Sequence, residues 1–256
     1  MPEEEPQPQP IDAVLGGTTA PPRPYDGVLG GTKGITLREA LPRIDQAVKE
    51  KLAGLNLSGL ELEELPLEIG KCTHLTELNL SNNQITSIPE SLRPLSNLTR
   101  LDLSGNQITS IPESFGQLSN LTRLDLDNNE ITSIPESLGQ LSDLTRLDLS
   151  GNQITSIPES LRQLSNLTRL DLNNNQITSI PKAITHLSNL TWLSLSSNKI
   201  TFVPRTLSDM KNLEILDLGK NPLFFPNSIF GKIWFRFLPK SSNHIKYGMY
   251  GQTLKN

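Results

Sequence analysis

Residues 98–120 read LTRLDLSGNQITSIPESFGQLSN, and nearly the same 23-residue string recurs along the middle of the chain. We number positions within the repeat from its opening leucine, which is position 0. A fixed period of roughly 20–29 residues with the pattern L-x-x-L-x-L-x-x-N-x-L predicts a solenoid of stacked coils. No single coil can bury its own leucines, so stability depends on neighbouring coils. The eight repeats begin at Leu52, Leu75, Leu98, Leu121, Leu144, Leu167, Leu190 and Leu213.

Three features of the repeat predict its local structure on the inner side. Positions 3 and 5 are leucine, as in Leu101 and Leu103, and a polar residue usually stands between them. This alternation predicts a short strand with one buried face. Position 8 is asparagine in seven of the eight repeats, and its side chain can both donate to and accept from backbone groups where the strand ends. Stacking would arrange these asparagines in a ladder: Asn83, Asn106, Asn129, Asn152, Asn175, Asn198 and Asn221.

The second half of the repeat predicts a turn on the outer side. Position 14 is proline in seven repeats, from Pro66 to Pro204. Proline ends a strand and presets the backbone for a turn or a short helix where no amide donor is needed. The E-S-L-x-x-L segment that follows places apolar positions 17 and 20 on one side of a helical turn. Cys72 occupies position 20 of the first repeat, and we interpret it as a small buried hydrophobic residue.

In the leucines, asparagine and proline of this repeat, residues 52–233 resemble the leucine-rich repeat family, in its intracellular I-P-x-x-L form with 23-residue repeats. The chain is similar to the repeat domains of bacterial Roco GTPases and to Ras-scaffold repeat proteins. The resemblance implies an α/β solenoid, a right-handed horseshoe with a parallel β-sheet on the concave face and short helical or 3-10 turns on the convex face. It also implies use as a protein-binding surface. The motif is specific for the fold and weakly specific for activity.

The N-terminal part of the chain divides into two segments. Residues 1–34 are rich in Pro and Gly and are predicted to be disordered. They contain DAVLGGT at 12–18 and DGVLGGT at 26–32, which we interpret either as a duplicated tether or as a docking motif that adds a strand to a partner. Residues 35–51 predict a capping helix. Thr36 and Glu39 fit a capping box, and an apolar stripe runs from Leu37 to Leu52 at helical spacing.

The repeat domain covers residues 52–235, and residues 236–256 complete the C-terminal cap and form a polar tail. Repeat 8 is one residue short, because Phe225-Pro226 stands where the pattern expects Ile-Pro one step later. Residues 228–238, SIFGKIWFRFL, are rich in aromatic residues. We interpret them either as a cap over the last coil or as an amphipathic stretch that makes peripheral contact with a membrane or a partner.

Composition excludes several functional classes. The formal net charge of −4 over 256 residues provides no broad basic field, so nucleic acid is not expected as a ligand. The start of the chain is acidic and proline-rich, unlike a signal peptide. No apolar stretch approaches the roughly 20 residues that a membrane-spanning helix needs, so membrane insertion is not expected. We therefore expect a cytoplasmic protein, and a monomer.

No constellation of residues predicts catalysis, a cofactor or a metal. The three histidines lie apart, without zinc-ligand spacing, and the phosphate-binding pattern G-x-x-x-x-G-K-[ST] is absent. Asp125, Asp127, Asn129 and Glu136 match four positions of an EF-hand loop. Glu130, however, replaces the glycine that makes the sharp turn of that loop, and the repeat itself explains the match. The sequence thus predicts a non-enzyme.

The candidate binding surface lies on the outward face of the predicted strands, at positions 2, 4 and 6. Stacking at about 4.8 Å would turn these positions into columns of arginine and aspartate. We interpret them either as a lattice that neutralises itself or as a platform for a polar protein surface. The candidate concave-face residues are Arg100, Asp102, Arg123, Asp125, Arg146, Asp148, Arg169, Asp171, Trp192, Phe202 and Ile215.

Trp192, Phe202 and Ile215 interrupt the regular pattern, and with Arg169 they form the expected hot spot. Packing against the C-terminal aromatic segment is the alternative for this patch. The favoured function is a non-catalytic scaffold or adaptor that binds another protein. The alternative is the recognition arm of a signalling system that acts with a separate enzyme, such as a Roco-type GTPase.

Overall fold

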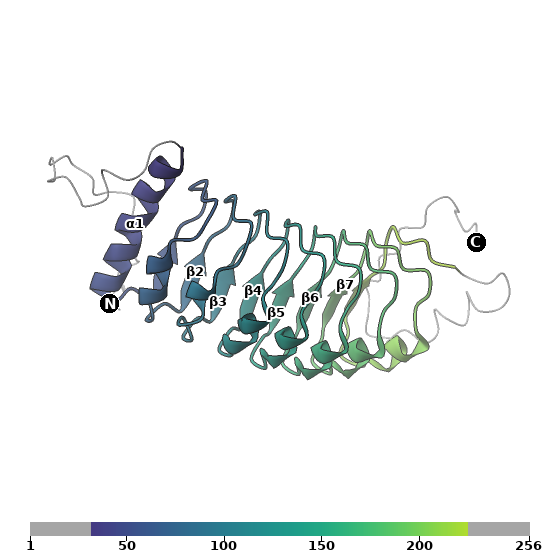
Figure 1. The fold of residues 1–256 in the computed structure, drawn as a ribbon. Coiled ribbons are helices and arrows are strands. Elements are labelled where there is room, and N and C mark those ends of the chain that lie inside the picture. The colour runs from purple at the N-terminus through teal and green to yellow at the C-terminus, as the bar shows by residue number, and fades with distance from the viewer. Residues whose placement is uncertain (1–31, 225–256) are drawn as a thin grey trace, which may run out of the picture.

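The computed structural model describes residues 32–224, with side chains from residue 37 onward. One helix, α1 (Thr32–Glu50), precedes a stack of coils, and each coil contributes one short strand to a single sheet (Figure 1). The strands are β1 (Gly54–Asn56), β2 (Glu77–Asn79), β3 (Arg100–Asp102), β4 (Arg123–Asp125), β5 (Arg146–Asp148), β6 (Arg169–Asp171), β7 (Trp192–Ser194) and β8 (Ile215–Asp217).

The convex side carries one 3-10 helix for each of seven coils. Each follows the proline at position 14, which adopts an extended backbone conformation and has no amide hydrogen to leave unpaired. The helices are η1 (Leu67–Lys71), η2 (Glu90–Leu92), η3 (Glu113–Gln117), η4 (Glu136–Gln140), η5 (Glu159–Gln163), η6 (Lys182–His186) and η7 (Arg205–Asp209).

All eight strands pair in parallel and in chain order, from β1 to β8. Residues at the same repeat position face each other, so that Arg100 pairs with Arg123, and Leu101 with Leu124. The sheet is open at both ends, which fits the predicted horseshoe and confirms the fold class. One consequence matters for function: every repeat position becomes a straight row across the sheet.

The ladder asparagines bond each coil to the one before it. The side-chain nitrogen Nδ2 of Asn129 donates to the carbonyl oxygens of Leu103 at 3.0 Å and Leu126 at 3.1 Å. The side-chain oxygen Oδ1 accepts from the backbone amide of Ile108 at 3.0 Å. The same pattern recurs at the other six ladder positions. The asparagine ladder predicted from the sequence is therefore confirmed.

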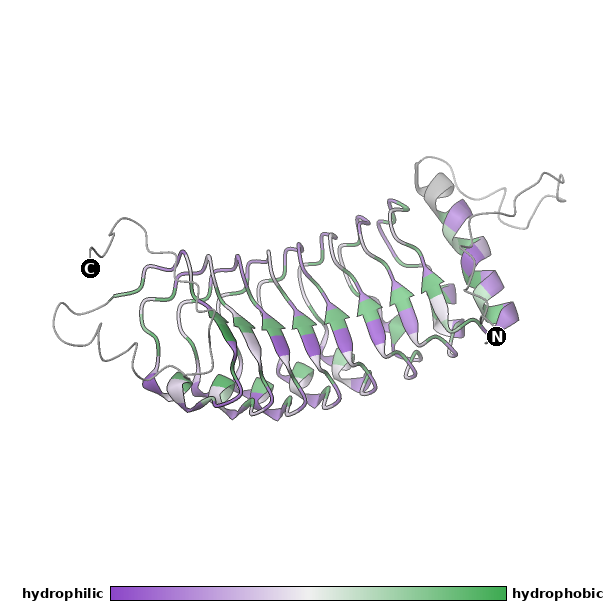
Figure 2. Ribbon diagram, turned by 180° about the vertical axis from the view of Figure 1, so that it is seen from behind, coloured by the Kyte–Doolittle hydropathy of each residue, from purple (hydrophilic) through white to green (hydrophobic). Residues whose placement is uncertain are grey.

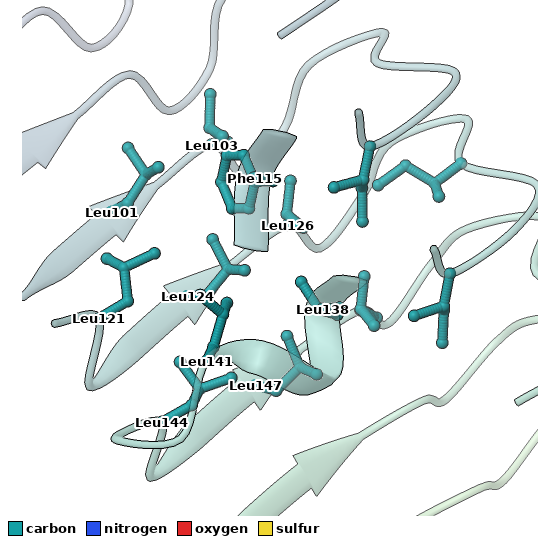
Figure 3. Close-up of a cluster of buried hydrophobic side chains, with 14 of the residues drawn as sticks. Leu101, Leu103, Phe115, Leu121, Leu124, Leu126, Leu138, Leu141, Leu144 and Leu147 are labelled. Carbon is teal, nitrogen blue, oxygen red and sulfur yellow. The ribbon is translucent and has the colours of Figure 1, made fainter. Parts of the chain in front are cut away.

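The core is one continuous apolar cluster that runs the length of the stack. Strand leucines such as Leu101 and Leu124 meet convex-side residues such as Phe115 and Leu138 between the sheet and the 3-10 helices (Figure 3). Cys72 is buried and carries a free thiol. Its Sγ lies 3.8 Å from the carbonyl oxygen of Ile44, at the contact between α1 and the first coils.

Helix α1 covers the N-terminal end of the stack. Ala40, Ile44 and Ala47 are its most buried side chains. The predicted capping box at Thr36 is wrong, because the helix begins at Thr32 and Thr36 lies inside it. Pro42 is also accommodated within the helix. The predictions for residues 1–31 and 225–256, including the duplicated motif, the short eighth repeat and the aromatic segment, lie outside the described residues.

A further conformational feature recurs at position 7. All eight residues there have positive φ, between 54° at Ser197 and 67° at Gly59. Gly and Asn, which tolerate the left-handed region best, occupy six of the eight positions. At Gly105 an added Cβ would also lie 2.7 Å from Asn82 Oδ1. Glycine there supplies both the backbone conformation and the space that the neighbouring coil needs.

Candidate protein-binding site on the concave face

The exposed face of the sheet is built from rows at positions 2, 4 and 6. Because successive side chains of a strand point to opposite faces, the leucine at position 3 is buried while its neighbours project outward. Figure 2 shows the hydrophilic band on the central strands and its loss toward β7 and β8. The structure therefore brings the predicted arginines, Trp192 and Ile215 into one row at position 2.

The arginines pair with aspartates on their own and neighbouring strands. Arg123 Nε lies 2.5 Å from Asp125 Oδ2. Arg146 lies between two carboxylates, with 3.7 Å from Nε to Asp125 Oδ1 and 3.7 Å from Nη2 to Asp148 Oδ2. Arg169 Nη2 lies 3.5 Å from Asp171 Oδ2. Charge pairing within and between strands therefore holds the row together.

The aspartates do not form an exposed acidic column. Asp125, Asp148 and Asp171 are buried, whereas Asp102 is half-buried. Their outward direction is as expected, but the arginine side chains lie over them because guanidinium groups reach farther than the short carboxylates. A hydrogen bond to the backbone also holds the Asp148 carboxylate close to the sheet. Its Oδ1 accepts from the amide of Ser150 at 3.1 Å, and this bond closes the turn after the strand.

Burial and like charge perturb the titration of this row. Burial raises the pKa of Asp171 above its ordinary value, and the nearby charge of Asp148 adds to the increase, while bonds from Asn173 and Arg169 oppose it. Burial likewise raises the pKa of Asp127, again with a contribution from Asp148. The hydrogen bond to Asp125 raises the pKa of Arg123, which remains charged.

The row changes character at Trp192. The guanidinium carbon of Arg169 lies 4.3 Å from the centre of the Trp192 ring, a cation–π contact. Ile215 pairs directly with Trp192 on the next strand. Beneath them Ser194 replaces aspartate, and Asn173 of the previous coil compensates, because its Oδ1 accepts from the Ser196 amide at 3.1 Å. Asn173 is the single asparagine at position 6, but its compensating role was not predicted from the sequence.

Of the residues in the expected hot spot, Phe202 is the one that lies outside the position-2 row. It lies between β7 and η7, after the chain has left the sheet, and so it does not join the row of Trp192 and Ile215. Its side chain is exposed, and the adjacent carbonyl of Thr201 accepts from the amide of Phe224, another exposed aromatic residue. A further residue missed from the sequence is Glu77, which pairs with Arg100 at 3.6 Å.

The described residues hold no group of His, Cys, Asp or Glu side chains that could bind a metal ion. None of the helices within residues 32–224 is long and apolar enough to cross a membrane.

Two family models match the chain. The model described as "Leucine rich repeat" matches residues 50–108, 119–177, 144–200 and 165–223, and the model described as "Leucine Rich repeats (2 copies)" matches residues 96–139. These matches cover well over half of the 256 residues. The chain therefore belongs to the leucine-rich repeat family. A search of curated protein sequences found no match.

Solved structures similar to this chain include plant receptors. One is the leucine-rich repeat ectodomain of the membrane receptor kinase GASSHO1/SCHENGEN3 from Arabidopsis thaliana in complex with CASPARIAN STRIP INTEGRITY FACTOR 2, with 32% identity, a TM-score of 0.62, and coverage of 68% of this chain and 22% of that one. Another is the plant peptide hormone receptor RGFR1 in complex with RGF2, with 28% identity, a TM-score of 0.55, and coverage of 66% and 36%.

A third similar structure is the Arabidopsis receptor kinase HAESA in complex with the peptide hormone IDA and the co-receptor SERK1. It has 28% identity and a TM-score of 0.64, and the match covers 78% of this chain and 34% of that one. The chain thus spans between 22% and 36% of the length of these three solved chains. All three are leucine-rich repeat or receptor structures solved with a bound factor or hormone.

Proposed function

We propose that this protein is a non-catalytic scaffold or adaptor that binds a partner protein through the concave face of its repeats. The observation that carries the proposal is the position-2 row, where arginines held by buried aspartates stand beside Trp192 and Ile215. Arginine and tryptophan are the residues most enriched in binding hot spots. The bound complexes of the similar receptors support a protein or peptide as the partner class.

The more specific alternative is a recognition arm that acts in signalling with a separate enzyme, such as a Roco-type GTPase. It rests on the resemblance of the repeat sequence to the repeat domains of Roco proteins. A cytoplasmic location and a monomeric state belong to the same proposal and rest on sequence composition. Cell fractionation and light scattering of the purified chain test these two points directly.

The proposal is tested by affinity capture with three forms of the full chain: wild type, Arg123→Gln/Arg146→Gln on the concave face, and Arg162→Gln/Lys182→Gln on the convex side. Glutamine keeps a donor beside the aspartates, and circular dichroism checks that each form folds. We expect the affinity of the concave variant for specific partners to fall by at least about tenfold, which corresponds to about 1.4 kcal/mol of binding free energy. The convex control should retain them, because Arg162 and Lys182 are exposed away from the sheet.

Identical partner sets for all three forms would refute the concave-face proposal. Loss of a GTPase from the captured set of the concave variant would favour the recognition-arm alternative. Deletion of residues 1–34 is the fourth form to compare. If that deletion alone abolishes capture, the duplicated N-terminal motif carries the function instead.

A further inference from the structure

The charges of the concave face are sorted by depth. The side chains of Arg123, Arg146 and Arg169 are 35%, 33% and 34% exposed, whereas those of the paired aspartates are 8% exposed at Asp125 and 9% at Asp171. An approaching molecule therefore meets guanidinium groups first and carboxylates only beneath them. Positions 2 and 4 of β4, β5 and β6 hold three arginines and three aspartates, so these positions look neutral in the sequence. In the structure the outermost charges at positions 2 and 4 of β4, β5 and β6 are cationic, and the half-buried Asp127 at position 6 is the acidic side chain beside them.

These guanidinium groups are held in place before any partner arrives. Arg146 is fixed between Asp125 and Asp148, and Arg169 between Asp171 and the ring of Trp192. Side chains that are already ordered lose less entropy on binding, so each contact contributes more to affinity. The Nε atoms of Arg146 and Arg169 and Nε1 of Trp192 have no hydrogen-bond acceptor among the described residues. These three atoms are themselves buried, so a partner reaches the row through the exposed parts of the guanidinium groups.

The cationic row ends at an apolar step. Trp192 and Ile215 follow Arg169 in the same register, and no charged residue occupies position 2 of β7 or β8. With strands about 4.8 Å apart, the three arginines span about 10 Å, and the midpoint between Trp192 and Ile215 lies about 17 Å from Arg123. In an extended peptide, side chains on one face recur about every 6.6 Å. Two such side chains fit over the arginines, and a third reaches the apolar step.

We infer that the partner docks an extended segment that crosses the strands from β4 to β8, with acidic side chains at residues i and i+2 and an apolar side chain at i+4. The inference rests on the proposed concave-face function and specifies the partner for it. The carboxylates lie over Arg123, Arg146 and Arg169, and the apolar side chain lies against Trp192 and Ile215. A basic segment is disfavoured because it meets like charge over the three arginines.

The test is a display selection of random nonapeptides on the immobilised full chain, with counter-selection on Arg146→Gln/Arg169→Gln. We expect the selected peptides to share the pattern acidic-x-acidic-x-apolar. Labelled peptides containing E-S-E-S-L, K-S-K-S-L and E-S-E-S-S are then compared by fluorescence anisotropy. The first should bind at least about tenfold more tightly than either of the others, and its affinity should fall as salt is added.

A second readout locates the peptide. The chain has two tryptophans, and Trp234→Phe leaves Trp192 as the sole tryptophan emitter. The E-S-E-S-L peptide should change this emission, and Ile215→Ser should weaken its binding without changing the circular dichroism. A basic consensus, no consensus, or tighter binding of an oligouridylate than of the acidic peptide would overturn the inference. If the inference fails while affinity capture still depends on Arg123 and Arg146, the broader function survives.

Discussion

The ladder asparagine shows how one residue type can join two coils. The Asn129 side chain satisfies backbone groups on both coils that it joins, and no other side chain of this size combines two donor hydrogens with an acceptor oxygen. Its requirement is therefore chemical rather than a matter of volume. Leucines at positions 3 and 5 supply the burial, and the asparagine makes the turn beside them compatible with that burial.

Replacing Asn129 by alanine is expected to destabilise the protein by about 3 kcal/mol. The change leaves the Ile108 amide buried without a partner, at about 1–3 kcal/mol. It also removes the hydrogen bonds to the carbonyls of Leu103 and Leu126, although Asn106 still donates to the Leu103 carbonyl. Urea unfolding measures the loss. Asn120→Ala is the matched control, because that exposed side chain makes one hydrogen bond to the carbonyl of Ser96, and its loss should cost about 1 kcal/mol or less. Equal losses for the two variants would contradict the ladder argument.

Asp171 predicts a pH dependence of stability with a definite sign. Its folded-state pKa is raised above the ordinary value of 3.8, so the folded protein binds this proton more tightly than the unfolded chain does. Stability contributed by the group is therefore greatest at acid pH and falls as pH rises from the ordinary pKa through the raised one. Neutral pH is where the charged carboxylate costs most.

Asp171→Asn should accordingly gain in stability relative to wild type as the pH rises from about 4 to about 7. Asparagine keeps the oxygen that accepts from the Asn173 amide and removes the charge. Denaturant unfolding at the two pH values gives the difference. The exposed Asp143→Asn is measured in the same way as the surface comparison. A stability gap between Asp171→Asn and wild type that narrows toward neutral pH would reverse the assigned sign.

At the scale of single elements, the 3-10 helices of the convex side pack closely where glycine allows it. A Cβ added at Gly139 in η4 would lie 2.5 Å from the carbonyl oxygen of Ser160 in η5. The same contact at Gly116 in η3 would be 2.6 Å from the Ser137 carbonyl. Backbone atoms on the receiving side cannot move as a flexible side chain could. Glycine therefore sets the spacing of the neighbouring coils at these two positions.

Gly139→Ala is expected to destabilise the protein by about 1–3 kcal/mol, because η4 and η5 must separate to admit the methyl group. Gly54→Ala in β1 is the comparison, since nothing lies within 4 Å of its added Cβ. That change should be neutral or stabilising by up to about 1 kcal/mol, as it restricts the unfolded chain. Thermal and urea unfolding of both variants distinguish these outcomes. A harmless Gly139→Ala would show that the coils can spread freely.

The elements also mark where sequence reasoning succeeds and where it stops. The strands, the asparagine ladder and the proline turns could be predicted from the sequence, because every repeat carries the same residue types at the same positions. The start of α1 does not, because Thr36 looks like a cap although the helix continues back to Thr32. The burial of a side chain on the outward face is equally hard to predict. Alternation predicts that Asp125 points outward, but it is buried because neighbouring arginine side chains extend over it. Phe202 lies outside any strand, so the repeat pattern of the strands does not determine where its side chain points.

At the scale of the whole molecule, a solenoid has two ends whose apolar edges need cover. Each coil contacts only its neighbours, so stability is approximately a sum of coil terms and interface terms along one dimension. Helix α1 provides the first interface through Ile44, which is fully buried, and through the contact with Cys72. Loss of this interface should therefore be felt most strongly in the nearest coils, and weakly in distant ones.

Ile44→Ala tests this distribution of stability by hydrogen exchange. The cavity should cost about 2–5 kcal/mol, and the protection of the Leu57 amide, which bonds to the Asn79 carbonyl at 2.8 Å, should fall by tenfold or more. The Leu172 amide, bonded to the Ser194 carbonyl at 2.9 Å, should change by less than about twofold, since it follows β6 and four strands lie between β6 and β1. Gln46→Ala, an exposed change on the same helix, should leave both amides unaffected. Equal loss of protection at Leu57 and Leu172 would mean that the stack unfolds as one unit, and that the α1 interface stabilises the distant binding row as much as the first coil.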